Sequence, residues 1–210
     1  MGQYGKAIAL HEEHKKIVEE VGDRAGLMRA CRNLGKCHAA EGKLVQALAY
    51  LNQSYQISRE LQLRGDQLRS ALFLGSALGL AVSADCRGHA TEASLGQAAP
   101  HTPSSLSEGM KDRVEEARKW LQIALEGGVQ DAHLQLAHVA FDTGQEEEAL
   151  GHLMRYLAWC VEKGRNACRG CEQVRGEDAQ MLTCGGKLCD CKLSCWLLHK
   201  RGPALVCDCR

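Results

Sequence analysis

Eight of the twelve cysteines in this chain of 210 residues lie between Cys168 and Cys209. Cysteine thiolate and histidine imidazole are the side chains that commonly hold Zn²⁺ in tetrahedral sites of four ligands. The first pair, Cys168 and Cys171, is separated by two residues, so a short turn can bring both sulfur atoms to one ion. Cys191 and Cys195 are four residues apart and would lie on one face of a helix. The candidate zinc ligands are Cys168, Cys171, Cys184, Cys189, Cys191, Cys195, His199 and Cys207, with Cys209 as a substitute for Cys207.

The compartment decides whether clustered thiols indicate metal binding or disulfides. The N-terminal sequence MGQYGKAIALHEEHKK lacks the apolar run that a signal peptide needs. We therefore expect an intracellular protein, cytoplasmic or nuclear, in a reducing compartment where clustered thiols usually bind metal. The cysteine-rich segment also has too few apolar residues to build a core without metal. A tail that forms disulfides or acts in redox chemistry is the alternative interpretation.

The residues before the cysteine cluster repeat with a period of 40. A shift by this period superimposes small and large residues alike: Gly2 on Gly42, Ala7 on Ala47, Ile17 on Ile57, Leu34 on Leu74 and Gly35 on Gly75. Within one period, apolar residues recur at spacings of three and four from Leu27 to His38, and again from Leu44 to Tyr55. Such spacing predicts two amphipathic helices, and Gly42 marks the turn between them.

This predicted helix pair resembles the tetratricopeptide repeat. Leu34-Gly35, Gly42, Ala47 and Leu51 occupy the places of the family's pattern, and the small residues let the two helices approach closely. The period of 40 is similar to the longer repeats of the Leu-Gly-Asn-repeat-type G-protein regulators. The resemblance covers about residues 1–163. Its downstream matches are Val114, Ala117, Leu121 and Ala124, followed by Leu136-Ala137, Ala140, Gly144, Ala149 and Leu153.

The predicted fold is therefore mainly α, an antiparallel helix-hairpin solenoid followed by a small zinc-stabilised domain. We expect repeats over 1–82, a flexible insertion or weak helix over 83–110, further repeat helices over 111–163 and the cysteine-rich domain over 164–210. The insertion carries two of the three prolines and many small polar residues. The sequence enters the array at the second helix of a repeat, so this helix belongs to an incomplete copy or exposes an apolar groove.

The order of ligands from Cys168 onwards resembles the MYND-type zinc finger, which binds two zinc ions in interleaved fashion. The resemblance implies one intact site, made of Cys168, Cys171, Cys191 and Cys195. The second site departs from the family's pattern, because Lys187 and Pro203 stand where ligands are expected. Either the finger is degenerate and this site is absent, or the site is assembled from Cys184, Cys189, His199 and Cys207 or Cys209.

Composition and missing motifs narrow the function further. The 26 basic and 26 acidic residues balance, so the net charge implies no polyelectrolyte partner. His11 and His14 are three residues apart, whereas the two histidines of the zinc-protease motif are four apart. With no glycine-rich phosphate loop or nucleophile motif in the sequence, we expect no enzyme and no small-molecule substrate. We also recognise no apolar stretch long enough for a membrane span and expect no membrane partner.

The two resemblances together imply a zinc-binding protein–protein interaction scaffold. Helical repeats form a concave surface that takes peptides, and MYND-type fingers bind short proline-containing segments of partner proteins. Six basic residues near the first helices of two repeats favour acidic partners, unless they form an ordinary solvated face: Arg29, Arg32, Lys36, Arg59, Arg64 and Arg69. The alternative function is a nucleic-acid-associated transcriptional regulator that uses the finger, although residues 164–210 carry only a slight basic excess.

Overall fold

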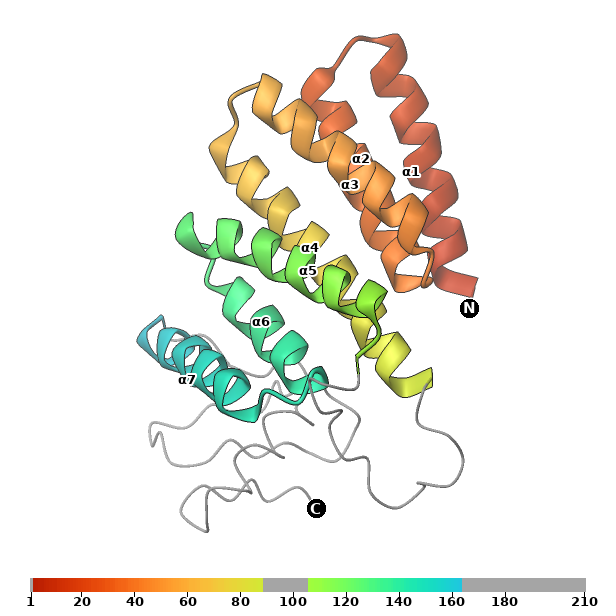
Figure 1. Cartoon of the computed structure of the whole chain (residues 1–210). Coiled ribbons are helices and arrows are strands. Elements are labelled where there is room, and N and C mark those ends of the chain that lie inside the picture. Colours follow the sequence, from red (N-terminus) through yellow and green to blue (C-terminus); the bar gives the residue numbers. More distant parts are fainter. Residues whose placement is uncertain (1, 89–105, 164–210) are drawn as a thin grey trace.

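The computed structural model describes residues 2–88 and 106–163, and this part of the chain is a row of α-helices without strands (Figure 1). Neighbouring helices run antiparallel and stack side by side, from α1 at one end of the array to α7 at the other. The predicted mainly helical repeat array is confirmed for these residues. The helices are α1 (Gly2–Glu20), α2 (Arg24–Ala40), α3 (Leu44–Glu60), α4 (Arg64–Gly88), α5 (Glu108–Glu126), α6 (Asp131–Asp142) and α7 (Glu146–Glu162).

Three helix hairpins make up most of the array, and α1 packs against the first of them. The hairpins are α2 with α3, α4 with α5, and α6 with α7, and each first helix also packs on the second helix of the preceding unit. The core therefore runs along the whole array as a series of clusters between adjacent helices. This nearest-neighbour arrangement is the one that the period of 40 predicts.

A close contact brings the two helices of each hairpin together. A Cβ atom added at Gly35 of α2 would lie 2.5 Å from Cγ of Leu51 on α3, a distance that real side chains do not reach. A Cβ atom added at Gly75 of α4 would likewise lie 2.5 Å from Cγ of Leu121 on α5. The third hairpin has Ala137 at this place, buried in one cluster with Ala149 and Leu153. Small residues on the first helix thus create the space that a leucine of the second helix fills.

Helices α1, α2, α3, α5 and α6 end in turns of one type. Gly22, Gly42, Gly128 and Gly144 each follow a helix with φ between 73° and 87°. The residue after each of them donates a backbone hydrogen bond to a carbonyl in the last turn of the helix, for example Lys43 N to His38 O at 2.9 Å. Gln62, after α3, occupies the same place with φ of 56°, although it carries a side chain.

The predicted insertion falls between the two helices of the second hairpin. Twelve positions separate Gly35 from Ala47, whereas 42 separate the equivalent Gly75 from Ala117. The sequence predicts a flexible insertion or weak helix over 83–110; within this range α4 continues through 83–88 and α5 includes 108–110. These extra turns are helical because Val82, Cys86 and Met110 bury their side chains in one apolar cluster. Residues 89–105 lie outside the described part of the chain.

Helix α4 corrects the expectation that the sequence contains no apolar stretch of membrane-spanning length. Its segment Arg64–Cys86 is long and apolar enough to cross a membrane by length and composition. Nearly half of that stretch is buried inside the array, where α4 packs against α3, α5 and α6. Burial on several sides explains the apolar composition of this helix, since a helix that is hydrophobic around most of its surface suits the centre of a core.

Replacing Gln62 by glycine should stabilise the protein. Glycine adopts positive φ without the steric cost that a side chain carries, so we expect the free energy of unfolding of the full chain to rise by about 0.5–1 kcal/mol. Urea unfolding followed by circular dichroism measures the change. The matched control is Gly42→Ala, at the same place one helix earlier, which should lose stability by a similar amount. A less stable Gln62→Gly variant would show that this turn carries no steric strain.

Candidate functional site

All predicted zinc ligands lie in residues 164–210, which are outside the described part of the chain, so both zinc sites remain predictions. The described residues hold no group of three or more histidine, cysteine or acidic side chains that could bind a metal. The four cysteines among them, two on α2 and one each on α4 and α7, form no disulfide with one another. Burial raises the pKa of the Cys31 thiol to about 11, so this thiol is protonated at neutral pH and acts as a packing residue.

The first helices of two hairpins share a surface that combines positive charge with apolar side chains. We call it the α2–α4 face and define it by Arg29 and Lys36 of α2 and Arg69, Phe73 and Leu80 of α4. Spacings of four and seven residues place each set on one side of its helix. The Lys36 ammonium lies 4.7 Å from the centre of the Phe73 ring, so the two sets adjoin.

Four of the five side chains on this face are exposed to a partner, and Phe73 is half-buried against the core cluster of Leu51, Leu74 and Ala77. Arg29 and Arg69 are 53% and 61% exposed. Each makes one loose ion pair at 3.6 Å, Arg29 with Asp23 and Arg69 with Asp66. Leu80 is 51% exposed, which is high for a leucine on a core helix. Among the described residues, no carboxylate lies within ion-pair distance of Lys36. The face therefore offers positive charge that the described part of the protein leaves largely unneutralised.

The six basic residues singled out from the sequence divide into three groups. Arg29, Lys36 and Arg69 lie on the α2–α4 face. Arg32 is only 11% exposed and donates to Asp66 at 2.7 Å, so its charge joins α2 to α4 and is not available to a partner. Arg59 and Arg64 flank the turn between α3 and α4 and are exposed there. Phe73 and Leu80 cannot be told from core residues in the sequence, because α4 is apolar along most of its length.

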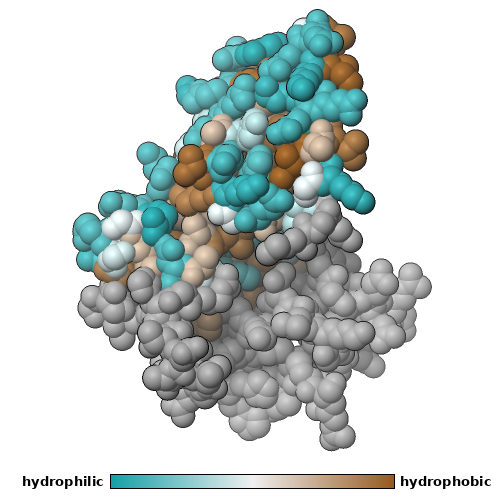
Figure 2. All heavy atoms as spheres, turned by 90° about the vertical axis from the view of Figure 1, so that its right-hand side faces the viewer, coloured by the Kyte–Doolittle hydropathy of each residue, from teal (hydrophilic) through white to brown (hydrophobic). Residues whose placement is uncertain are grey.

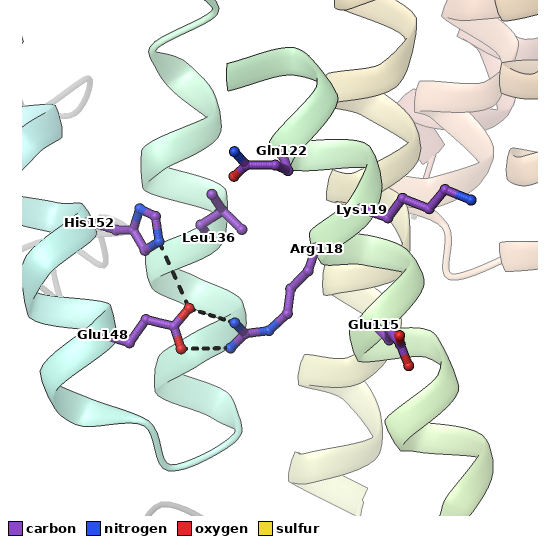
Figure 3. A pocket seen from close by; sticks show the side chains of 7 residues that line it. All are labelled: Glu115, Arg118, Lys119, Gln122, Leu136, Glu148 and His152. Atoms are coloured by element: carbon purple, nitrogen blue, oxygen red, sulfur yellow. Dashed lines mark hydrogen bonds and ion pairs between the residues drawn. The ribbon is translucent and has the colours of Figure 1, made fainter. Parts of the chain in front are cut away.

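A second candidate is a pocket of about 340 Å³ between α5, α6 and α7 (Figure 3). Arg118 reaches across it and makes a forked ion pair with Glu148, with distances of 2.5 and 3.0 Å. His152 lies on the same side of α7, with Nε2 3.9 Å from the Glu148 carboxylate. The residues around the pocket are Glu115, Arg118, Lys119, Gln122, Leu136, Glu148 and His152.

Two histidines extend this network into the α6–α7 contact. His133 of α6 and His152 approach with their Nδ1 atoms 2.8 Å apart. One Nδ1 must donate and the other accept, so at least one of the two rings is neutral. Burial lowers the pKa of both histidines, and the positive charge of Arg155 lowers both further. The charge of His133 also lowers the pKa of His152, against the Glu148 carboxylate, which raises it.

The chemistry of the pocket is that of a structural clamp. Glu148 neutralises Arg118, and Gln145 accepts a further hydrogen bond from the same guanidinium. The Lys119 side chain points away from the Glu148 carboxylate, so it adds no second cation to the pair (Figure 3). Among its lining residues the pocket holds no nucleophile paired with a base. The sequence offers one weak signal of the network, the spacing of four residues between Glu148 and His152, while Arg118 is remote in sequence and comes close only by packing.

The histidine pair should make stability depend on pH. Both folded-state pKa values lie below the ordinary histidine value of about 6.5, so the unfolded chain binds protons first as the pH falls. The free energy of unfolding should therefore fall as the pH drops below about 6.5 toward the lowered values. In His152→Gln this decline, measured by urea unfolding at neutral and mildly acidic pH, should be smaller. Replacing His11 of α1 by glutamine serves as control, because His11 is remote from the α6–α7 contact; equal declines in the two variants would refute the assignment.

Comparison with known proteins agrees with this architecture at the N-terminal end. No curated protein matches the chain at a significant level. The family match covers α1, α2 and α3, and α4–α7 repeat the same hairpin contact beyond it. Residues 1–60 match the model of the tetratricopeptide repeat family, and the described helices form a helical repeat array of that kind.

Proposed function

We propose that this protein is a zinc-binding protein–protein interaction scaffold. In this proposal the helical array binds a peptide segment of one partner, and the cysteine-rich segment forms a zinc-stabilised finger that binds another. Tetratricopeptide repeats generally mediate protein–protein interactions and are typically non-enzymatic, which supports the first half of the proposal. A reducing compartment, cytoplasmic or nuclear, would keep the thiols available for zinc.

The α2–α4 face is the observation that carries the peptide-binding role. Its exposed cations would attract a partner with acidic residues, and Phe73 with Leu80 would receive an apolar side chain of that partner. When a carboxylate of the partner approaches, Lys36 would give up its cation–π contact and form an ion pair. The Phe73 ring would then be available to pack against an apolar side chain of the partner. The recognised segment is therefore acidic with at least one large apolar residue. The balanced charge of the whole chain and the slight basic excess at its C-terminal end give the nucleic-acid alternative no comparable support.

Reversing the charge of Lys36 tests this role. With the full chain, we expect selection from a synthetic peptide library to enrich acidic peptides that contain a large apolar residue. Lys36→Glu should weaken a selected peptide by about tenfold or more, because a like charge replaces an attraction. The control is Lys111→Glu on α5, which reverses the charge of an exposed lysine on another helix and should leave the affinity within about twofold. Fluorescence anisotropy measures both affinities. Equal losses in both variants, or no acidic preference, would contradict the proposal.

Metal content tests the finger. We expect the purified chain to hold at least one zinc ion, bound by Cys168, Cys171, Cys191 and Cys195. Replacing Cys171 by serine should lower the zinc content by one equivalent, measured by elemental analysis after dialysis. Cys37→Ser should leave it unchanged, because Cys37 belongs to α2. Two equivalents in the unaltered chain would assign the second set of ligands as well, and a chain without zinc would refute the finger.

A further inference from the structure

Helix α1 has an apolar stripe that no described residue covers. Leu10 and Ile17 are 65% and 52% exposed, and Val21, directly after the helix, is 72% exposed. The backbone hydrogen bond from Val21 N to Ile17 O continues the last turn, so the spacing places all three on one side together with Ala7 and His14. We call these five residues the α1 stripe. A different side of α1 packs on α2, where Val18 is only 6% exposed. Figure 2 looks onto the side of the molecule where α1 lies and shows brown apolar surface among the polar residues.

The internal repeat shows what kind of structure this stripe fits. The shift of 40 residues places Ile17 of α1 on Ile57 of α3, and Ile57 is only 3% exposed. On α3 this side is covered by α2, whose Leu27 and Met28 share a cluster with Ile57. The equivalent of Ala7 is Ala47, which is completely buried beside Gly35 of α2. The α1 stripe therefore has the shape and composition of a surface that another helix covers.

The stripe is complementary to a second copy of itself. Its members lie at positions 7, 10, 14, 17 and 21. Their spacing is nearly symmetric about His14, with two members at similar distances on each side. If a second α1 packed antiparallel on the stripe, Leu10 of one copy would lie opposite Ile17 of the other. Ala7 would lie opposite Val21, so that a small residue faces a large one at each end of the contact. A two-fold axis would pass near His14, as closed dimers of identical chains require.

The charges along the free border of the stripe favour the antiparallel orientation. Lys6, Glu13 and Glu20 line this border at intervals of seven residues, and none of them is in an ion pair within the described structure. In an antiparallel pair, Lys6 of each copy would approach Glu20 of the other, which gives two favourable ion pairs. The two Glu13 side chains would approach each other, which gives one repulsion. In a parallel pair this border would face the opposite border of the partner's stripe, so Lys6 would not approach Glu20 and both attractions would be lost.

We propose that two copies of this chain form a dimer through antiparallel pairing of their α1 helices along the α1 stripe. Three exposed apolar residues from each copy make a small interface, so the dimer should dissociate in the micromolar range. The proposal is independent of peptide binding, because the α2–α4 face and the zinc ligands contribute nothing to this contact.

Sedimentation of the full chain between about 1 and 100 µM tests the dimer. We expect a reversible monomer–dimer equilibrium, and Leu10→Glu or Ile17→Glu should raise the dissociation constant by about tenfold or more, because each would bury a charge in the apolar contact. The matched control is Val45→Glu on α3, which replaces an even more exposed valine, at 81%, and should leave the dimer intact. Circular dichroism verifies that each variant is folded.

A charge exchange tests the orientation. Lys6→Glu and Glu20→Lys should each weaken the dimer, and the double variant should restore it, since the opposite charges would then meet again with their places exchanged. A chain that is monomeric throughout this concentration range would overturn the proposal. So would a dimer that is insensitive to Leu10→Glu and Ile17→Glu, because another surface would then form it.

Discussion

The close approach of two helices at a small residue is the constraint on which the described array depends. Gly35 and Gly75 leave room on the first helix of a hairpin, and Leu51 and Leu121 fill it from the second. A side chain at either glycine would push the helices apart, because buried leucines have no space into which to retreat. This contact also determines the spacing between successive first helices. Helices α2 and α4 are therefore close enough for Lys36 to lie over Phe73.

The second hairpin keeps this contact although its two helices are separated by many more residues than in the other hairpins. The cost of closing a loop grows only with the logarithm of its length, so additional residues between α4 and α5 weaken the hairpin little. Packing then holds the ends of the helices together. Val82, Cys86 and Met110 form an apolar cluster there, and Arg113 of α5 pairs with Asp85 of α4.

Charged residues serve two purposes in this array, and their surroundings decide which. Arg32 and Lys36 are one turn apart on α2, yet the largely covered Arg32 pairs with Asp66. Lys36 lies over an aromatic ring and has no carboxylate partner among the described residues. The Arg118–Glu148 pair resembles the Arg32–Asp66 pair in function, since it joins α5 to α7 across a pocket. Charges used in this way hold helices in register, whereas those of the α2–α4 face and the border of α1 are free to meet a partner.

The sequence by itself determined the helix pairs, their glycine turns and the residues at the hairpin contact, because periodicity and small residues act locally and repeat every 40 residues. It also defined the candidate zinc ligands by their spacing, although these lie outside the described residues. Only the tertiary structure decided which basic residues are free, that His133 meets His152, and that Ile17 is exposed while its equivalent Ile57 is buried. Each of these depends on a neighbouring helix that is distant in sequence, and a pattern within one helix carries no information about that neighbour.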